Sequence, residues 1–399
     1  CWPCMKIKSE HIHLIAFDIP YPANYGGVID IFFKLKALHL IGVKVTLHCY
    51  QYGREQSEEL EKYASKVFYY KRRTFKNPFY SKLPYIVASR NTTELLENLL
   101  SDDRPILFEG LHCCYYLNHP ALKNRLKIVR THNVEHDYYS KLEEVENNFF
   151  KKYFFRIESE RLKRFESQLK HANLIAAISP ADYAHFAKKF PQSFYLPAFH
   201  PNEHLSSKEG KGDYAFYHGN LSVGENDQAA RFLVNEVFND LDIPLIIAGS
   251  NPSRELVKSL EDKPHIQLLN HLNSEEMLRY IQEAQINVLP TFQSTGIKLK
   301  LINSLYLGRH CLVNAMMVNE TGLESFCIIA NTASQFKKEL KKYMNEGFTE
   351  EDIASRALYL ETRFSNIENA RKLMAAIHEA KTLLESVPTH NDKSFQKTY

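Results

Sequence analysis

Short apolar runs and segments of helical periodicity alternate along the first half of the chain. The apolar runs are Ile12–Phe17, Val43–Cys49, Val67–Tyr70, Ile106–Phe108, Ile128–Thr131 and Leu174–Ile178. Helical patterns lie between them, most clearly Val28–Leu40, which ends just before Gly42, and the long segment Glu143–His171. Strands that alternate with helices of this length predict a parallel sheet covered on both faces.

The same alternation starts again after Pro197–Gly212, a segment rich in proline, serine, glycine and charge that is typical of a linker. The apolar runs after it are Tyr214–Tyr217, Leu245–Ala248, Ile266–Leu269, Ile286–Leu289 and Cys311–Val313. Helical patterns separate these runs, and Asn273 with Glu276 predicts a capping box for a helix that runs to Ala284. We therefore predict an α/β protein with two Rossmann-like, doubly wound domains.

The composition agrees with this organisation. A length of 399 residues corresponds to two domains of ~100–200 residues each. Hydrophobic content of 44% and charged content of 24% are ordinary for a globular protein, and a net charge of +3 gives no support to a nucleic-acid partner. No apolar run approaches the ~20 residues of a membrane span, and no signal segment opens the chain. We therefore expect a cytoplasmic protein.

The seven cysteines are scattered, and several lie within apolar runs, which favours reduced core thiols over a disulfide framework. Cys1 and Cys4 have thioredoxin-like spacing, but no strand precedes them. We interpret them as a cloning remnant before a native start at Met5, and expect no redox function.

Ligands of open α/β sheets bind beyond the carboxyl ends of the strands. With two such domains, the expected site is the cleft where both sets of strand ends face each other. The loops that follow the predicted strands are Asp18–Gly27, Glu109–Cys114, His132–His136, His218–Glu225, Gly249–Ser253 and Pro290–Ile297.

The stretch Thr291–Asn314 leads from a polar loop into a helix that we expect to open near Ile297. A helix N-terminus suits a phosphate, and Gly296 lets a ligand approach the backbone closely. Lys298 falls within the apolar arc of this helix, so its charge needs a partner, and a bound anion would be one. Lys300, Asn303 and Ser304 form a separate polar stripe. Such a stripe is also typical of a solvated face.

Two other loops carry candidate chemistry. Gly26 and Gly27 follow the first strand, where a phosphate-approaching loop belongs, but the full G-x-G-x-x-G pattern is missing and a plain turn fits equally well. His132, Asn133, Glu135 and His136 follow the Ile128–Thr131 strand. Their spacing does not match a zinc motif. His132 is either a substrate-contacting histidine or a loop histidine that bonds its own backbone.

Two stretches combine basic and aromatic residues, Tyr69–Tyr85 and Phe149–Phe165. Their basic residues include Lys71, Arg72, Arg73, Lys151 and Lys152. Lysine and arginine beside interfacial aromatics favour contact with anionic lipid headgroups. RNA binding could use the same residues, and a solvated face is the plain alternative.

Six segments carry a family resemblance. They are PYPANYGG, RTHNVEHDYY, ISPADYAHF, YHGNLSVGENDQAARFL, IPLIIAGSNPS and STGIKLKLINSLYLGRHCLVN. Together they resemble the GT-B glycosyltransferases, specifically the retaining group (glycosyl transferases group 1 type) that includes bacterial polysaccharide and lipid glycosyltransferases. The likeness covers nearly the whole chain and rests on the order of the motifs.

The resemblance implies an acceptor-binding domain over residues 5–200 and a nucleotide-sugar domain over residues 213–362. It also implies a helix over 363–385 that crosses back to the first domain. The donor would be a UDP- or GDP-sugar, with no cofactor and no metal required. Donor-binding positions implied by the loops are Gly26, Gly27, Gly219, Asn220, Gly249, Thr295, Gly296, Ile297, Lys298, Lys300 and Asn303.

The chain departs from the family pattern at its acidic motif. The Glu-x7-Glu positions fall on Thr295 and Asn303, so both acids are absent. The basic pair that follows the first strand of the second domain is likewise replaced, by Asn220 and Glu225. An amide can still bond a ribose hydroxyl, but without charge.

Other residues match the family. Lys298 and Lys300 match a subgroup with an R-L-K version of this helix, which implies that Lys298 first and Lys300 second neutralise the diphosphate. His132 corresponds to the family histidine beside the transferred sugar, which contacts sugar hydroxyls and shapes the transition state. The resemblance further implies retention of configuration, with the leaving phosphate drawing the proton of the acceptor.

These observations leave three functions open. The first is a glycosyltransferase of cell-surface glycan or glycolipid synthesis, working at the inner face of the cell membrane on a glycan or lipid-linked acceptor. The second is a catalytically inactive GT-B-like binding or scaffold protein, which the missing acids favour. The third and weaker one is a sugar-nucleotide epimerase.

Overall fold

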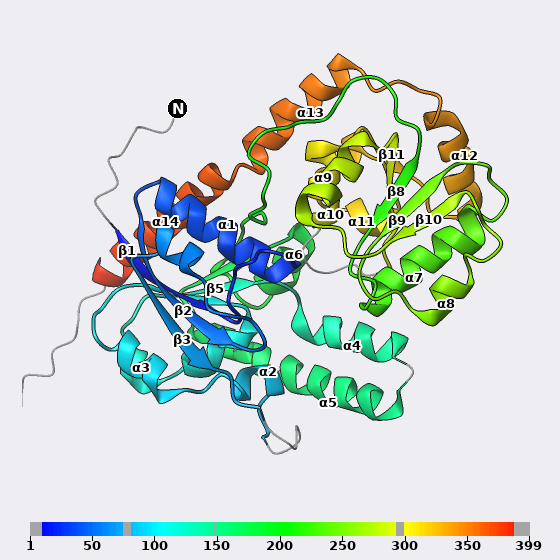
Figure 1. Ribbon diagram of the computed structural model, residues 1–399. Helices are drawn as coiled ribbons and strands as arrows, with labels where there is room; N and C mark the ends of the chain where they lie inside the picture. Colours follow the sequence, from blue (N-terminus) through cyan, green and yellow to red (C-terminus); the bar gives the residue numbers. More distant parts are fainter. Residues whose placement is uncertain (1–9, 75–80, 147, 293–298, 387–399) are drawn as a thin grey trace, which may run out of the picture.

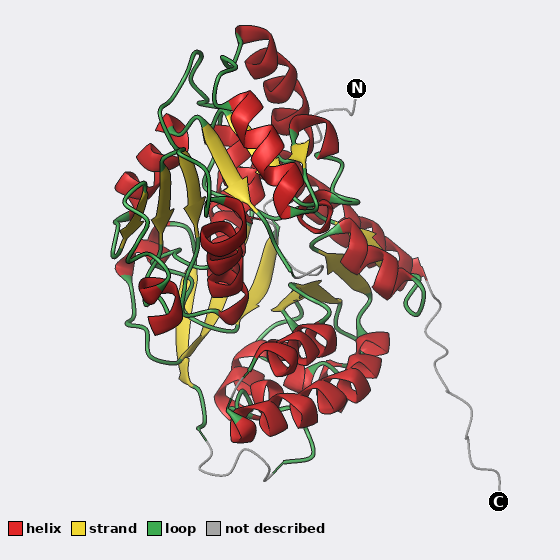
Figure 2. Ribbon diagram, turned by 90° about the vertical axis from the view of Figure 1, so that its right-hand side faces the viewer, coloured by secondary structure: helices red, strands yellow, loops and turns green. Residues whose placement is uncertain are grey.

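The computed structural model describes residues 10–74, 81–146, 148–292 and 299–386. Two lobes, each built around a sheet with helices on its faces, make up the described chain (Figures 1 and 2). In the described residues, all neighbouring strands of both sheets pair in parallel. The predicted fold class, two Rossmann-like doubly wound domains, is confirmed.

The sheet of the first lobe has seven strands in the order β3-β2-β1-β4-β5-β6-β7. The strands are β1 (His11–Ala16), β2 (Lys44–Gln51), β3 (Lys66–Lys71), β4 (Ile106–Glu109), β5 (Lys127–Thr131), β6 (Leu174–Ala177) and β7 (Ser193–Tyr195). All residues of β4 and β5 are buried, as expected of central parallel strands with helices on both faces. The strand order reverses between β1 and β4, which is where doubly wound sheets bind ligands.

Helices cover both faces of this sheet. They are α1 (Gly26–Leu40), α2 (Tyr85–Ala88), α3 (Thr93–Leu99), α4 (Glu135–Val145), α5 (Phe149–Phe165) and α6 (Pro180–Ala187). A 3-10 turn, η4 (Glu166–His171), extends α5, and another, η2 (Leu111–Tyr116), follows β4. The single helix predicted over Glu143–His171 is wrong, because the chain is extended at Glu146 and restarts as α5 behind the N-cap of Asn148.

The sheet of the second lobe has the order β10-β9-β8-β11-β12-β13. Its strands are β8 (Ala215–His218), β9 (Leu245–Ala248), β10 (Ile266–Leu269), β11 (Ile286–Leu289), β12 (His310–Val313) and β13 (Ile328–Ile329). Its helices are α7 (Gly224–Phe232), α8 (Arg254–Lys258), α9 (Ser274–Glu283), α10 (Leu299–Leu307), α11 (Ala315–Val318), α12 (Ala333–Tyr343) and α13 (Glu350–Arg363). The predicted capping box of Asn273 and Glu276 is present at the start of α9.

The last helix, α14 (Asn366–Ser386), packs on the first lobe, alongside α1 (Figure 1). Its buried side chains, among them Leu373 and Ile377, belong to the core of the first sheet. The two segments that join the lobes are bonded to each other, because His200 donates from its backbone N–H to Asn366 at 3.1 Å and accepts from the Asn366 amide at 2.7 Å. His200 Nε2 also lies 2.8 Å from the carbonyl of Phe364.

Candidate functional site

His132 is held in one orientation by a buried carboxylate. It follows the last residue of β5, and its Nε2 lies 2.8 Å from Oε2 of Glu109, the last residue of β4. His132 is 4% exposed and Glu109 is fully buried. An ionised carboxylate only accepts, so Nε2 carries the proton and donates it. In the neutral imidazole, Nδ1 of His132 is then the acceptor nitrogen, and it has no hydrogen-bond partner within the described chain.

Glu109 belongs to a group of buried charges beneath the histidine. Lys34 donates to Glu109 at 2.7 Å and to Asp30, one turn earlier in α1, at 2.8 Å. Arg130 donates to both oxygens of Asp30, at 2.9 and 3.2 Å. All four of these charged side chains are 0% exposed. Burial alone would raise the pKa of Glu109, but Lys34 and His132 hold this pKa below its ordinary value, so the carboxylate stays ionised.

The charged group also fixes the start of the segment that leads to the second lobe. Arg130 donates to the carbonyls of Leu196 at 2.5 Å and Pro197 at 3.1 Å. Asp30 accepts the backbone N–H of Phe199 at 2.8 Å. Lys34, which bonds both Glu109 and Asp30, therefore links the carboxylate that orients His132 to the residues that hold the exit of the first lobe.

A phenyl ring separates His132 from a second histidine. Phe17, just after β1, packs against His132 at 5.3 Å and against His112 of η2 at 5.0 Å between ring centroids. Gly27 makes room for this ring, because a Cβ there would lie 2.4 Å from it. Burial lowers the pKa of His112 well below its ordinary value, so this imidazole is neutral.

Glu135 adds a carboxyl group beside His112. Its Oε1 lies 3.9 Å from Nδ1 of His112, and neither atom has a hydrogen-bond partner among the described residues. Burial raises the pKa of Glu135 to about 8, so the group is largely protonated near neutral pH. The carboxyl ends of β1, β4 and β5 thus present three buried atoms that have no hydrogen-bond partner among the described residues, Nδ1 of His132, Nδ1 of His112 and Oε1 of Glu135.

In the second lobe, Lys300 lies at the carboxyl end of β8. Its ammonium bonds to the side chain of Asn226 and lies 5.2 Å from the ring centroid of Tyr217. Gly219, the first residue after β8, allows this approach, because a Cβ there would lie 2.8 Å from Nζ of Lys300. Gly249, after β9, packs closely on the backbone of Gly219, since a Cβ added at Gly249 would lie 2.0 Å from the carbonyl oxygen of Gly219.

Asn220 organises the loop between β8 and α7. Its carbonyl accepts from Asn226 at 2.9 Å, and its side chain accepts from Ser222 at 2.7 Å. Glu225, in the first turn of α7, accepts from the hydroxyl of Thr291 after β11. The loops after β8 and β11, on either side of the point where the strand order reverses, are therefore joined.

Two of the other predicted donor positions lie where the lobes or the joining segment meet, and four lie outside the described residues. Gly26 lies against the opposite lobe, because a Cβ there would be 3.9 Å from Cδ1 of Leu299 at the start of α10. Asn303 accepts from Asn202, in the segment that joins the lobes, at 2.8 Å. Thr295, Gly296, Ile297 and Lys298 lie outside the described residues, so the proposed phosphate loop and its first lysine are not described.

The two lobes meet beside the N-terminus of α7, which contacts α4. A pocket lies at this junction and is lined by both lobes. Its lining residues are Lys141, Leu142 and Glu144 from α4, and Val223, Glu225, Gln228 and Phe292 from the second lobe. This pocket places Glu225, and with it the loop after β8, opposite the helix that begins just behind His132.

The two basic stretches of the first lobe lie side by side. The guanidinium of Arg72 lies over Tyr85, and Tyr85 packs against Phe154 of α5 at 6.3 Å between centroids. Lys71, Arg73, Lys151 and Lys152 are exposed. Phe149 and Phe150, at the start of α5, are 76% and 81% exposed. In the described chain, no helix combines the length and the apolar composition that a membrane span needs.

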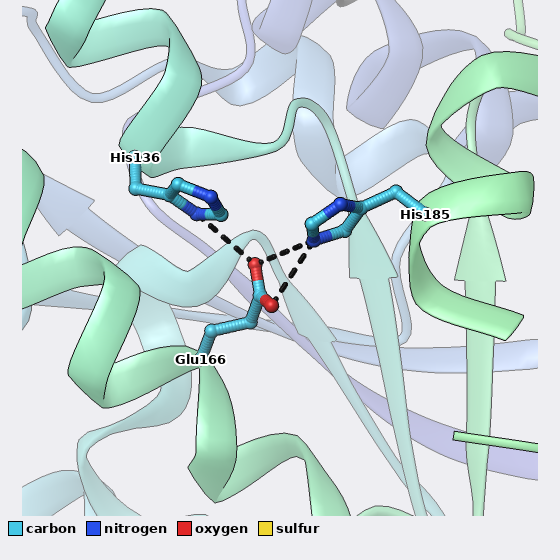
Figure 3. Close-up of side chains that lie close together, drawn as sticks. All are labelled: His136, Glu166 and His185. Atoms are coloured by element: carbon cyan, nitrogen blue, oxygen red, sulfur yellow. Dashed lines mark hydrogen bonds and ion pairs between the residues drawn. The ribbon is translucent and has the colours of Figure 1, made fainter. Parts of the chain in front are cut away.

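Two groups of side chains have the composition of a metal site. Asp30, Glu109 and His132 form the first, but Lys34 and Arg130 already bond to its carboxylates, so it has no net charge to offer a cation. The second consists of His136, Glu166 and His185 (Figure 3). The spacing of histidines and acidic residues along the sequence does not reveal this group, because its three members come from separate elements, α4, η4 and α6.

Sequence reasoning named His132 but missed Glu109, Lys34 and Asp30, which hold it. A signal was available, because Asp30 and Lys34 stand one turn apart on a helix whose other core-facing residues are apolar. Charges at such positions need partners. Nothing in the local sequence indicates that the partner of Lys34 would be Glu109.

No protein-family model matches the sequence. The chain is 26% identical over 359 residues to an uncharacterized 44.6 kDa protein in the cps region of Klebsiella pneumoniae, covering 83% of this chain and 90% of that one.

Three solved structures are similar over almost their whole length. A glycosyltransferase from Rickettsia africae has a TM-score of 0.61 and 12% identity, covering 94% of this chain and 99% of its own. Arabidopsis thaliana UGT89C1, complexed with UDP-L-rhamnose, has a TM-score of 0.57 and 12% identity, covering 93% and 99%. An E. coli protein bound with UDP-2-fluoro glucose has a TM-score of 0.59 and 11% identity, covering 95% and 100%.

Proposed function

Because the chain has the GT-B fold of these glycosyltransferases, we propose that it transfers a sugar from a nucleotide-sugar donor to a glycan or lipid-linked acceptor. The donor is a UDP- or GDP-sugar, and transfer proceeds with retention, as in the group that the motifs resemble. The similarity to a protein from a cps region supports a role in cell-surface polysaccharide synthesis.

The observation that carries the proposal is the pairing of His132 with Glu109. A histidine whose Nε2 donates to a buried carboxylate presents Nδ1 as an acceptor, and Nδ1 of His132 is buried without a partner in the described chain. Such an atom accepts a hydrogen bond from a sugar hydroxyl. The carboxylate behind it also stabilises positive charge that develops on the sugar in the transition state.

On the donor side, we assign the diphosphate to Lys300 and Lys298 and to the backbone amides near Gly296. Lys300 supports this assignment because Gly219 leaves its ammonium next to the backbone after β8. Lys298 and Gly296 are assigned from the family resemblance. Residues 5–200 form the acceptor domain, residues 213–362 form the donor domain, and helix 363–385 returns to the first.

We further propose that the basic and aromatic surface of the first lobe faces anionic lipid. The surface consists of Lys71 at the end of β3, Arg72 and Arg73 directly after it, and Phe149–Lys152 of α5. Exposed phenylalanines beside lysines suit the boundary between headgroups and acyl chains. This contact would bring a lipid-linked acceptor to the first lobe.

One observation favours the alternative of a binding or scaffold protein. Asn303, at the position of the second motif acid, has its side-chain oxygen engaged by Asn202. That oxygen is then less available to a nucleotide ribose. A protein that binds a nucleotide sugar but does not turn it over would fit this arrangement.

A ligand screen followed by an assay separates these functions. A ligand that binds only the folded protein raises its melting temperature, so UDP, GDP and their sugars are compared by thermal shift. The donor that stabilises the protein is then tested for release of nucleoside diphosphate, with and without membrane extract as acceptor. Stabilisation with release supports the transferase, stabilisation without release supports the scaffold, and no stabilisation by any nucleotide rejects both.

A further inference from the structure

A second histidine–carboxylate group lies away from His132, on the other side of the start of α4. His136 projects from the first turn of α4, Glu166 from the start of η4, and His185 from α6, and the three side chains converge (Figure 3). Nε2 of His185 lies 3.0 Å from both oxygens of Glu166, and Nδ1 of His136 lies 3.2 Å from Oε2. One ligand atom from each residue lies within 4.8 Å of the others.

His136 has the features of a metal ligand. It is 9% exposed, and its Nδ1 contacts Glu166 without hydrogen-bond geometry to any described residue. Its other nitrogen, Nε2, lies 3.4 Å from Asp137. A carboxylate beyond the ligating imidazole is the usual outer partner in metal sites, because it keeps the proton on the far nitrogen.

The position of Glu166 supports the same interpretation. Its side chain is 2% exposed and lies between the two imidazole rings, facing Nδ1 of His136 and Nε2 of His185 (Figure 3). A buried carboxylate oxygen between two imidazole nitrogens completes a set of three ligand atoms from three separate elements.

We propose that His136, Glu166 and His185 bind a divalent first-row transition-metal ion of the Zn²⁺ type. Two imidazole nitrogens and one carboxylate oxygen form a three-ligand set that suits such an ion and leaves positions for water. Glu166 binds through Oε2, while its Oε1 keeps the hydrogen bond from Lys189 at 2.9 Å. The Lys189 side chain is 52% exposed and can move toward solvent.

The ion would add a direct link between three elements, the start of α4, the start of η4 and helix α6, two of which are already joined by the bonds of Glu166 to His185 and Lys189. Since α4 begins at Glu135, just after the loop that carries His132, the ion also fixes the far end of that loop. The proposal does not depend on the transferase activity, and its test uses binding rather than turnover.

The test is a titration of the full chain with Co²⁺ and then Zn²⁺. Cys1 and Cys4 are replaced by serine, because two free thiols at this spacing bind such ions themselves. After treatment with EDTA and desalting, the protein is expected to take up one Co²⁺ with visible absorption, lose that signal to Zn²⁺, and gain melting temperature with either ion.

Variants locate the site. His136→Gln, Glu166→Gln and His185→Gln are each expected to weaken Co²⁺ binding by about 100-fold or more, since loss of an outer partner alone costs 10–100-fold. His204→Gln is the matched control, because its side chain is 85% exposed and outside the group. Lys189→Met is expected to strengthen binding several-fold, because it removes a cation beside the ion.

Two results would overturn the proposal. One is the absence of Co²⁺ uptake by the folded serine variant, which would make the group an ion-pair cluster centred on Glu166. The other is uptake that all three ligand variants leave unchanged, which would place the ion elsewhere. Circular dichroism of each variant identifies any that fail to fold. Lys189→Met, at a half-exposed position, distinguishes the two models even then. A metal site predicts tighter Co²⁺ binding in this variant, whereas an ion-pair cluster predicts lower stability and no gain in Co²⁺ affinity.

Discussion

Oε2 of Glu109 lies 2.8 Å from Nε2 of His132 and accepts a hydrogen bond from it, while Lys34 donates to the other oxygen of the same carboxylate at 2.7 Å. His132 is therefore oriented by Glu109 of the neighbouring strand β4. The negative charge of Glu109 is in turn balanced by Lys34 of α1. This relationship makes the role of the histidine testable separately from the stability of the site.

If His132 contacts the sugar in the transition state, as proposed, His132→Ala should reduce turnover about 100-fold or more while changing the Kd of the nucleotide less than about threefold. Measuring kcat and nucleotide Kd on the same preparation checks this. His378→Ala, an exposed histidine on α14, serves as control. Equal losses in turnover and affinity would contradict the assignment and indicate a binding or folding role.

We expect Glu109→Gln to lose turnover as well, because an amide can donate to Nε2 and shift the proton to Nδ1, the atom that should accept from the sugar. The single change leaves Lys34 without one of its two anions, so stability also falls, by about 3 kcal/mol. Adding Lys34→Met removes the excess charge. The double variant should regain stability, measured by urea unfolding, without regaining turnover. Recovery of both would show that Glu109 acts only on the fold.

We expect Gly219→Ala to weaken nucleotide binding about tenfold with little effect on stability. A Cβ at this position would lie 2.8 Å from Nζ of Lys300, and the flexible ammonium would have to move away from the backbone. Gly347→Ala is the matched control, because its Cβ would meet no atom within 4 Å. Calorimetric titration with the donor identified by thermal shift checks both. Unchanged affinity in Gly219→Ala would remove Lys300 from the donor site.

Much of the fold could be predicted from the sequence, because strands buried on both faces leave apolar runs and the loops between them carry turn residues. The strands β7 (Ser193–Tyr195) and β13 (Ile328–Ile329) were missed, since edge strands this short have no such run of their own. The break between α4 and α5 was missed because helical periodicity continues across Glu146 and Asn148.

The site was less predictable than the fold. His132 could be named from its place after a strand, but the pairing of Lys34 with Glu109 depends on which strand lies beside α1. The same is true of Glu166 and His185, which come from η4 and α6 and meet His136 of α4 only in the folded structure (Figure 3). A single sequence contains no record of such contacts between distant segments.

We expect stability to depend on pH through His200. Burial lowers the pKa of His200 to about 4. In the unfolded chain, the imidazole of His200 takes up a proton below about pH 6.5, whereas in the folded protein it stays neutral down to about pH 4. The stability that neutral, buried His200 contributes is therefore fully present above about pH 6.5 and is lost as the pH falls toward 4. The penalty of His200→Gln in denaturant unfolding should therefore shrink by about 1 kcal/mol between about pH 7.5 and 5.5. An equal penalty at both values would mean that folding leaves the pKa of His200 unchanged.

We expect the double variant Phe149→Ser with Phe150→Ser to lose binding to vesicles of anionic lipid, about tenfold or more, with no change in melting temperature. Both rings are largely exposed, so their removal costs no core packing. Leu358→Ser on α13, 77% exposed, is the matched control. Co-sedimentation with vesicles of anionic and of neutral lipid measures the effect. Binding of the wild-type chain to neither vesicle would reject the surface.

Arg130 and Asp30 anchor the start of the segment that leaves the first lobe. They form hydrogen bonds with its backbone at Leu196, Pro197 and Phe199. A rotation of one lobe against the other must therefore pivot beyond residue 199. His132 lies on the near side of that pivot, so it keeps its position in the first lobe while the second lobe carries the whole of any such rotation.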